Sequence, residues 1–459
     1  MRSHRSLGVV IKLGTSSIVD EKSHEPLLSI LTSIVETAVR LRKDGHRVII
    51  VSSGAIGVGL RRMDVEKRPK HLSKLQALAA IGQCRLMSLW DSLFTHLRQP
   101  IAQILLTRSD IADRSRYLNA QNTIVELLDM GVIPIVNEND TLAVSEIKFG
   151  DNDTLSAITA AMVHADLLFL MTDVDCLYDK NPRTNPDAQP IEVVEDIAAL
   201  VADVSTAGSS LGTGGMSTKI VAARLATSAG VTTVITRSSI PGNIIKIVKH
   251  IQASRSPASL VTTTQANTKD HPAEEDLAAS TTSLTTPGRA NIPLHTRFLP
   301  SPHPVRDRYF WILHGLRPHG TLYIDAGAYK ALLGKAGLLP VGVVDVEGVF
   351  AQQEAVRLCV VDKKLAAANA EGKLWEGAAV EVGRALTNYA SGEIARIKGR
   401  QSVEIEGLLG YADSEYVSQR ESISLFSRES RPATPSRDVV TFDGVGIGGY
   451  EGEAGEAGF

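Results

Sequence analysis

The amino-terminal half of the chain alternates short apolar segments with longer amphipathic ones, and this alternation constrains the fold more than any other feature. Short runs rich in Val, Ile and Leu are predicted as strands: Val9–Lys12, Val48–Ser52, Ile101–Leu106, Val132–Val136, Leu167–Met171 and Val231–Thr236. Segments with helical spacing of apolar residues lie between or after them: Leu27–Lys43, His71–Leu97, Ala120–Met130, Thr154–His164, Ser217–Ser228 and Asn243–His250. This order predicts an α/β fold, a three-layer αβα sandwich with a mostly parallel sheet.

The length of 459 residues exceeds one ordinary core, so we expect two domains. The alternating pattern places the first domain at residues 1–252. Residues 253–319 are predicted as a Ser/Thr-rich linker and domain connection. Residues 320–427 predict a small second domain of the α+β or β-barrel-like type. Residues 428–459 contain too little apolar surface to fold and are predicted as a disordered tail.

The overall charge does not indicate binding to nucleic acid or to an anionic membrane, because the formal net charge is only −3. The cysteines Cys84, Cys176 and Cys359 lie far apart and form neither a CxxC motif nor a His/Cys cluster. They therefore predict no disulfide framework and no zinc site, and a cytoplasmic protein fits this usage. No apolar run approaches the ~18–20 residues of a membrane helix, and the start is too short for a signal or transit peptide.

In a parallel sheet, ligands bind at the carboxyl ends of the strands, so the residues that follow each strand are the candidates for chemistry. Lys12 ends the first strand and Gly14 follows it. A lysine beside glycine and hydroxyl residues can present a cation and N–H groups to phosphate, although a surface lysine beside a turn gives the same pattern. The second strand ends in VSSGAIGVG, whose glycine spacing is not the GxGxxG of a dinucleotide site. These glycines either admit a ligand to the backbone or form a plain turn.

Asn, Asp and Glu gather at two neighbouring stretches, Asn137–Asp140 and Asp151–Asp153. One carboxylate suffices to cap the helix that follows, so this many polar side chains exceed a capping role. Amides suit the ammonium and carboxylate groups of an amino acid, and a carboxylate can receive an ammonium or orient lysines. The Thr172–Asp173 tip of a later strand is suited to a nucleotide's ribose, base or metal, or to a turn.

The glycine-rich stretch GTGGMSTK ends in Lys219 and precedes a helix. A loop of this kind points backbone N–H groups and the positive end of the helix dipole at an anion. Together with Lys12, Lys219 could flank a transferring phosphoryl group, a reaction that needs positioning and charge neutralisation more than covalent chemistry.

Taken together, these stretches resemble the amino acid kinase superfamily, and within it the glutamate 5-kinases. The resemblance is carried in order by KLGTSS, VSSGAIGVG, LLTRSDIADRSRYLNAQNT, VNENDT, KFGDND, MTDVDCLYDKNPRTNP and GTGGMSTK. The later segments GTLYIDAGAYKALL, LLPVGVVDVEGVF and GLLGY resemble a PUA domain. The resemblance implies the amino acid kinase fold with a carboxyl-terminal PUA domain. It also implies transfer of the ATP γ-phosphate to the γ-carboxylate of L-glutamate, the first step of proline biosynthesis.

The resemblance also assigns residues. It implies catalytic roles for Lys12, Lys219 and Asp153, with Asp153 orienting the two lysines. Glutamate is expected at Ser52, Gly54, Asn137, Asp140 and Asn152. ATP is expected at Lys12, Gly14, Thr172, Asp173, Thr213, Gly214, Gly215, Met216, Ser217, Thr218 and Lys219. No protein ligand for a metal is expected, because Mg²⁺ is expected to arrive with ATP and to keep its waters.

The resemblance further implies feedback inhibition by proline. Because proline shares the α-carboxylate and amine of glutamate, we hypothesise that it overlaps the glutamate pocket, with Asp113–Asn122 and Thr141–Phe149 as the candidate positions. It implies a homo-oligomer, a dimer or tetramer, and a glutamyl phosphate reductase is a further expected partner. No RNA binding is expected, since Lys330, Lys335, Lys398 and Arg400 are diluted by nearby acids.

Three other interpretations stay open from the sequence. The first is another superfamily member acting on acetylglutamate, aspartate, carbamate or a nucleoside monophosphate. The second is an RNA-binding PUA protein with a degenerate kinase half. The third is a scaffold that only binds glutamate or proline.

Overall fold

The computed structural model describes residues 5–20, 22–142, 152–197, 200, 215–254, 292–305, 307–364 and 374–426. The predicted ATP residues Thr213 and Gly214 lie outside these ranges. So do residues 255–291 of the predicted linker and the whole predicted tail.

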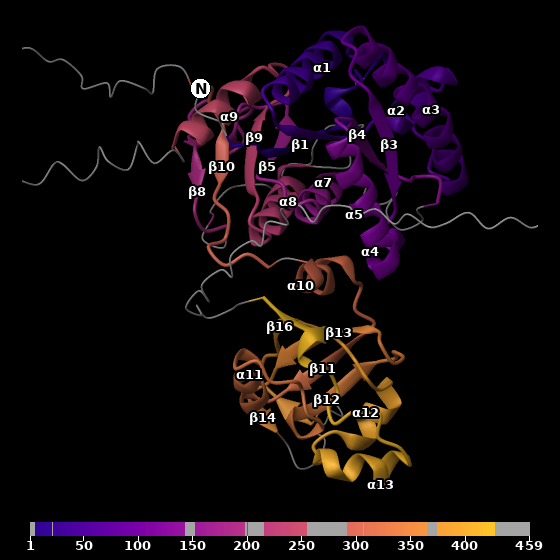
Figure 1. The fold of residues 1–459 in the computed structure, drawn as a ribbon, viewed down its shortest axis with the longest axis vertical. Coiled ribbons are helices and arrows are strands. Elements are labelled where there is room, and N and C mark those ends of the chain that lie inside the picture. Colours follow the sequence, from indigo (N-terminus) through magenta and orange to yellow (C-terminus); the bar gives the residue numbers. More distant parts are fainter. Residues whose placement is uncertain are drawn as a thin grey trace, which may run out of the picture.

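A large sheet organises the first domain (Figure 1). Its strand order is β3 (Ile101–Leu106), β4 (Ile133–Glu138), β2 (Arg47–Ser52), β1 (Gly8–Leu13), β5 (Leu167–Thr172), β9 (Thr232–Arg237), β10 (Thr296–Phe298) and β8 (Val193–Val194). All neighbours pair in parallel except β9 and β10. The predicted α/β fold with a mostly parallel sheet is confirmed. Strand β10 comes from the segment predicted as a connection, so that segment contributes a strand to this sheet.

Helices cover both faces of the sheet, and the alternation of side chains along β1 shows how. Val9, Ile11 and Leu13 belong to a buried cluster with α1 (Leu28–Lys43), α3 (Leu72–His96) and α9 (Asn243–Ser254). Val10 belongs to the opposite cluster, with α5 (Arg114–Asp129), α7 (Asn152–Met162) and α8 (Met216–Ser228). Because side chains alternate along a strand, Lys12 shares the face of Val10 and points toward α7 and α8.

The sequence left open whether the glycines of VSSGAIGVG admit a ligand or form a plain turn, and the structure places Gly57 and Gly59 in a helix. Residues Ala55–Arg62 form helix α2, and Gly54 precedes it with φ +96°, a conformation that glycine adopts without strain. Gly59 in α2 and Gly82 in α3 bring the two helices into backbone contact. A Cβ on Gly59 would lie 2.1 Å from the Leu78 carbonyl oxygen, and one on Gly82 would lie 1.7 Å from the Ala55 carbonyl oxygen. The sequence did not predict α2, because glycines are typical of loops. Here Gly59 instead allows the close packing of α2 on α3.

The connection after β3 is more helical than predicted. Helix α4 (Arg108–Ala112) begins with a capping box between Thr107 and Asp110, and α5 begins at Arg114 instead of near residue 120. The Asp113 carboxylate accepts a hydrogen bond from the Arg116 N–H and caps α5. A small hairpin, β6 (Leu177–Tyr178) with β7 (Pro190–Ile191), follows β5.

The second domain contains a mixed sheet in the order β12 (Val343–Gly348), β11 (Gly320–Ile324), β13 (Ala355–Val360), β16 (Val380–Leu386) and β17 (Ile423–Leu425). The pairs are antiparallel except β11 with β13. The remaining elements are α11 (Ala326–Leu333), α12 (Ser391–Ile397), α13 (Ile405–Leu409) and the pair β14 (Lys363–Lys364) with β15 (Trp375–Glu376). Short 3₁₀ turns occur at Thr15–Ser17, Pro340–Gly342, Ser402–Glu404 and Arg420–Ser422.

A helical connector, α10 (Asp307–Phe310) and the π-helical turn Trp311–Gly315, joins the two domains. The Trp311 indole donates a 2.9 Å hydrogen bond to the Ile111 carbonyl in α4. The Arg384 guanidinium in β16 donates to the Leu316 carbonyl at 3.0 Å. The connector thus contacts both domains.

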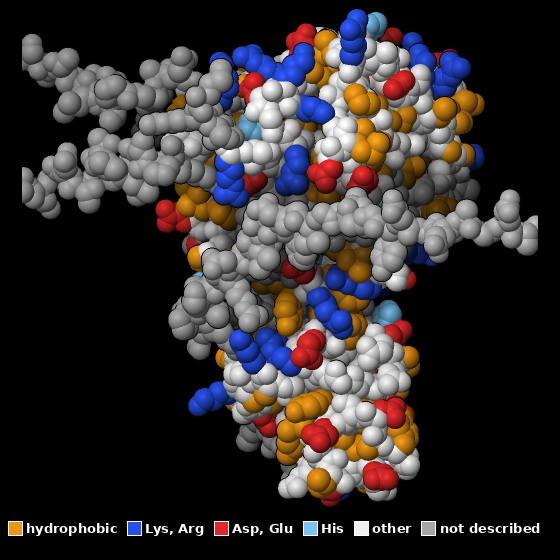
Figure 2. All heavy atoms as spheres, viewed as in Figure 1, with side chains coloured by type: hydrophobic (Ala, Val, Ile, Leu, Met, Phe, Trp, Pro, Cys, Tyr) orange, Lys and Arg blue, Asp and Glu red, His pale blue; other side chains and the backbone are white. Residues whose placement is uncertain are grey.

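Acidic and basic side chains both appear on the second domain in Figure 2. None of the helices in the described part of the chain has the length and apolar character of a membrane-spanning segment.

The glycine contact between α2 and α3 generates a stability prediction. Gly82→Ala forces the two helices apart, so we expect the free energy of unfolding to fall by about 1–3 kcal/mol. Gly407→Ala is the matched control, because nothing lies within 4 Å of a Cβ in this α13 glycine. Alanine there should add about 0.5–1 kcal/mol. Urea unfolding measures both changes, and equal stability of Gly82→Ala and the unchanged chain would contradict the packing argument.

Candidate active site

Four adjacent strands end at one edge of the large sheet, and each brings a predicted site residue there. Their order across the sheet is β4, β2, β1 and β5, which carry Asn137, Ser52, Lys12 and Thr172 at or next to their carboxyl ends. The pairings of Val51 with Val136 and with Lys12 keep these ends level. The site is therefore a row that follows the strand order.

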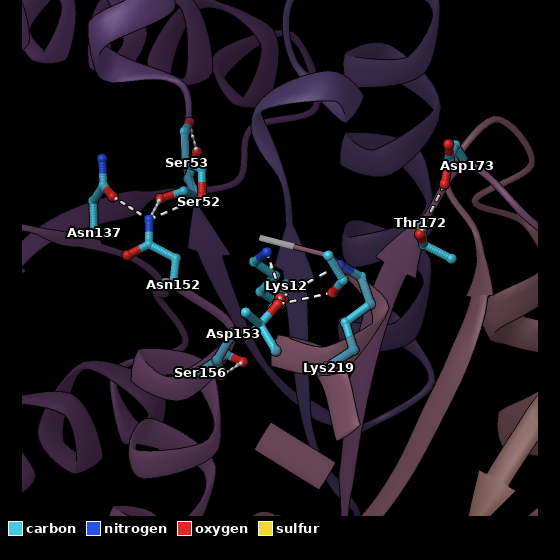
Figure 3. Close-up of polar contacts among 12 residues, drawn as sticks. Lys12, Ser52, Ser53, Asn137, Asn152, Asp153, Ser156, Thr172, Asp173 and Lys219 are labelled. Atoms are coloured by element: carbon cyan, nitrogen blue, oxygen red, sulfur yellow. Dashed lines mark hydrogen bonds and ion pairs between the residues drawn. The ribbon is translucent and has the colours of Figure 1, made fainter. Parts of the chain in front are cut away.

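Lys12, Asp153 and Lys219 form an ion triad at the centre of this row (Figure 3). The Lys12 Nζ lies 2.5 Å from Asp153 Oδ1, and the Lys219 Nζ lies 3.3 Å from Asp153 Oδ2. All three side chains are buried, and that of Asp153 is 0% exposed. The three residues lie far apart in sequence, on β1, α7 and α8, and the structure brings them together as expected.

The triad is held in place by local structure. Asp153 lies in the first turn of α7, where the positive end of the helix dipole favours a carboxylate. The Thr218 hydroxyl, one residue before Lys219, lies 2.8 Å from Asp153 Oδ2. Burial by itself would raise the pKa of Asp153, but the charges of Lys12 and Lys219 and the Thr218 hydrogen bond lower it to about 2. Asp153 is therefore ionised at neutral pH, between two cations.

An amide cluster of Ser52, Ser53, Asn137 and Asn152 lies on one side of the triad (Figure 3). The Asn152 Nδ2 donates to the Ser52 carbonyl at 3.0 Å, to the Ser53 hydroxyl at 2.9 Å and to the Asn137 Oδ1 at 2.9 Å. The Asn152 Oδ1 is buried and has no hydrogen-bond partner among the described residues. A buried acceptor of this kind is costly unless a donor occupies the site, which suits a ligand with N–H groups.

Asp140 lies three residues after Asn137, and its charge interacts with that of Arg68 from the connection between α2 and α3. Burial raises the pKa of Asp140 to about 6, against the opposing effect of the Arg68 charge. Burial also lowers the pKa of Arg68, while Asp140 raises it. The site thus presents an anion and a cation near each other, the pair of charges that a zwitterionic amino acid needs.

The other side of the triad carries the predicted nucleotide residues. The Thr172 hydroxyl donates to Asp173 Oδ1 at 3.1 Å (Figure 3). The Asp173 carboxylate also contacts Arg183. Gly215 precedes α8, and Met216, Ser217 and Thr218 form its first turn. The free N–H groups of this turn can bind phosphate oxygens. Nearby, Arg237 donates two 2.7 Å hydrogen bonds to Asp175, which ties the loop after β5 to β9.

The predicted glycines Gly14 and Gly54 lie at the same edge. A Cβ on Gly14 would lie 3.7 Å from the Lys12 Nζ, an ordinary contact distance, so Gly14 lies directly beside the ammonium group. Gly54 packs against Ile18 at the start of α2. Within the described ranges, no group of three or more His, Cys, Asp or Glu side chains could hold a metal ion.

Sequence reasoning missed several residues that contact this site, namely Ser53, Arg68, Gln83, Trp90 and Arg183. Gln83 accepts a 2.8 Å hydrogen bond from the Asn137 Nδ2, and the Trp90 indole donates to the Ser52 hydroxyl at 3.4 Å. Gln83 gave a usable signal, since it is a polar residue between Gly82 and Leu86 on the inward face of α3. Arg68 and Arg183 lie in connections between elements, and no periodic pattern marks them.

Comparison with known proteins agrees with the resemblance to the amino acid kinases and to a PUA domain over most of the chain. The amino acid kinase family model matches residues 8–237, and the PUA domain model matches residues 320–409. A Schizosaccharomyces pombe protein named probable glutamate 5-kinase is 52% identical over 422 residues, which cover 91% of this chain and 93% of that protein. Glutamate 5-kinase of Cyanothece sp. is 46% identical over 420 residues, covering 91% and 99%. Glutamate 5-kinase of Nostoc sp. is 45% identical over 429 residues, covering 92% and 98%.

The raised pKa of Asp140 generates a prediction about stability. A carboxyl whose pKa rises on folding binds a proton more tightly in the folded state, so its ionisation above pH 6 costs stability. Asp140→Asn removes this cost. We expect the variant to be more stable than the unchanged chain by about 1–3 kcal/mol at pH 8, and by much less near pH 4.

Urea unfolding at the two pH values measures this difference. Asp91→Asn, at an exposed position on α3, is the control and should change stability by less than about 0.5 kcal/mol. A pH-independent effect of Asp140→Asn, or a loss of stability at pH 8, would contradict the assignment of Asp140 as a half-buried, destabilised carboxylate.

Proposed function

Because the chain belongs to the amino acid kinase family, we propose that it transfers the γ-phosphate of ATP to the γ-carboxylate of L-glutamate. The products are L-glutamyl 5-phosphate and ADP, and the reaction is the first step of proline biosynthesis. The observation that carries the proposal is the buried triad of Lys12, Asp153 and Lys219. It lies between the amide cluster on one side and Thr172–Asp173 on the other (Figure 3).

The reaction needs no general base. A γ-carboxylate oxygen attacks the γ-phosphorus, a new O–P bond forms, and the bond from that phosphorus to the β,γ-bridging oxygen breaks. The bond electrons remain on that oxygen, which leaves with ADP. Both reactants are anions, so repulsion between them is a large part of the barrier, and fixed cations lower it.

Lys12 and Lys219 supply those cations from opposite sides of Asp153. We propose that Lys12, on β1 beside Ser52, neutralises the phosphoryl group on the glutamate side, and that Lys219, on α8, does so on the nucleotide side. Asp153 holds both ammonium groups at fixed positions. The two cations therefore need to move little when the transition state forms.

We propose that glutamate binds at the amide cluster and Asp140. The Asp140 carboxylate supplies a counter-charge to the α-ammonium, and the Arg68 guanidinium supplies one to the α-carboxylate. Amide groups of Asn137 and Asn152 can both donate and accept, which suits the same zwitterion.

We propose that ATP binds at the first turn of α8 and at Thr172–Asp173. We propose that Mg²⁺ enters as part of the nucleotide substrate, because this ion keeps several of its waters and is commonly held by substrate phosphates. The Asp173 contact with Arg183 lies at the same edge, so Arg183 is within reach of the nucleotide side of the site.

The direct test is ADP release and hydroxamate formation with ATP and a panel of acceptors: L-glutamate, N-acetylglutamate, aspartate, carbamate and UMP. We expect ADP release and a hydroxamate only with L-glutamate. Turnover confined to another acceptor would overturn the proposal, and no turnover with any acceptor would favour a binding protein.

The role of Lys219 is tested by Lys219→Met. Methionine keeps the length of the side chain and removes the charge, and Asp153 retains Lys12 as a partner. We expect kcat with glutamate to fall at least about 100-fold, because one preorganised charge contact to the transition state is lost. Lys246→Met, at an exposed position on α9, is the matched control and should keep full turnover. Near-normal turnover of a folded Lys219→Met protein would overturn the assignment.

We further propose feedback inhibition by proline at the glutamate pocket, because proline shares an α-carboxylate and an amine with glutamate. Of the two expected positions, Asp113–Asn122 forms the cap and first turns of α5, and the other is described only at Thr141 and Leu142. Thr141 follows Asp140 directly, and its hydroxyl donates to Asn139 Oδ1 at 2.6 Å.

Thr141→Ala should therefore weaken proline inhibition. We expect the half-inhibiting proline concentration to rise about 3–10-fold while the glutamate KM changes less than about twofold, because one hydrogen bond of the loop is lost. Ser92→Ala is the control, since it removes a similar local hydroxyl hydrogen bond at an exposed position of α3. Full proline sensitivity of Thr141→Ala would count against this location.

Three broader proposals complete the function. Exposed residues Ala77, Ala80, Ile81 and Cys84 along α3 support a homo-oligomer, which light scattering tests. The labile acyl phosphate product supports transfer to a glutamyl phosphate reductase, which a co-sedimentation assay tests. The free thiols of the three cysteines support a cytoplasmic location, which cell fractionation tests.

A further inference from the structure

Helix α3 contributes two side chains to the amide cluster, although no residue of this helix was a predicted site residue. Gln83 and Trp90 are seven residues apart and therefore lie on the same face of the helix. The Gln83 Oε1 accepts a 2.8 Å hydrogen bond from the Asn137 Nδ2. The Trp90 indole, fully buried, donates to the Ser52 hydroxyl.

The hydrogen bonds of the cluster run in one direction. Asn137 donates to Gln83 through its Nδ2, and its Oδ1 accepts from the Asn152 Nδ2 and from the Glu138 N–H. Each of these contacts requires the other amide in a fixed orientation, because an amide carbonyl only accepts and an amide NH₂ only donates. The end of the series is the buried Asn152 Oδ1, an acceptor without a partner among the described residues.

We propose that Gln83 is a positioning residue that determines specificity for an α-amino acid. Its side-chain carbonyl holds Asn137, and through Asn137 the Asn152 amide, so that the Asn152 Oδ1 faces the α-ammonium of the substrate. The inference rests on the proposed function, since it concerns how that site recognises glutamate. Loss of the Gln83 carbonyl leaves the Asn137 Nδ2 without its acceptor, and the Asn137 side chain then no longer fixes Asn152.

The backbone around Gln83 is fixed to the same cluster. Gly82 contacts the Ala55 carbonyl directly, and Ala55 begins α2 two residues after Ser53. The position of Gln83 is therefore tied to the loop that carries Ser52 and Ser53, without an intervening side chain. This contact gives the hydrogen-bonded series of Gln83, Asn137 and Asn152 the rigidity that a specificity-determining group requires.

The experiment compares glutamate with glutarate, which lacks only the α-amino group. Gln83→Met removes the carbonyl at similar length, and Gln83→Glu keeps an acceptor of the same length. For Gln83→Met we expect the ratio of kcat/KM for glutamate to that for glutarate to fall about tenfold. The loss should appear in the glutamate KM, with kcat and the ATP KM within about threefold of the unchanged chain.

Gln83→Glu should restore the ratio to within about threefold, and Arg85→Met, at an exposed position on the same helix, should leave it unchanged. The role of Gln83 is overturned if Gln83→Met keeps the ratio, if Gln83→Glu loses as much as Gln83→Met, or if the ATP KM rises with the glutamate KM. If Gln83→Met does not fold, Gln83→Asn takes its place, because its shorter side chain cannot reach Asn137.

Calorimetric titration of glutamate and glutarate separates this inference from the proposed function. Absence of glutamate turnover in the unchanged chain contradicts the proposed function. A tenfold loss of glutamate binding in Gln83→Met, with glutarate binding unchanged, supports the role of Gln83 in either case. Equal binding of glutamate by the unchanged chain and by Gln83→Met overturns it.

Discussion

The buried carboxylate of Asp153, held between the ammonium groups of Lys12 and Lys219, is the interaction on which the arrangement of the site depends. Taking these three charges out of water is costly, and only close pairing offsets the cost. The pairing requires β1, α7 and α8 to meet at one point. The strand register and the alternation of side chains along β1 point Lys12 toward α7, and the start of α7 at Asn152 places Asp153 in its first turn.

The second constraint is the contact between α2 and α3. Glycines at positions 59 and 82 let the two helix backbones touch, and this contact sets the position of Gln83 and Trp90 relative to the substrate side of the site. The triad is therefore supported from one face of the sheet and the amide cluster from both, because Asn152 lies on α7 whereas Gln83 and Trp90 lie on α3. The triad depends on α7 and α8, and the amide cluster depends in part on α3.

Much of the fold followed from local sequence. All six predicted strands and the six predicted helices are present, because their apolar periodicity is strong. Helix α2 was missed because its glycines are typical of a loop, and the early start of α5 was missed because its first turns are polar. In both cases a contact elsewhere, or a capping carboxylate such as that of Asp113, stabilises the helix against a weak local preference.

By itself the sequence determined the α/β architecture and placed Lys12, Asp153 and Lys219 at the edge of the sheet. Strand ends, helix starts and glycine loops are indicated by the residues immediately around them in the sequence. Only the tertiary structure decided that the charges of Arg68 and Asp140 interact and that Gln83 accepts from Asn137. These pairs join elements far apart in sequence, and their partners are selected by packing distance and burial, which no local pattern encodes.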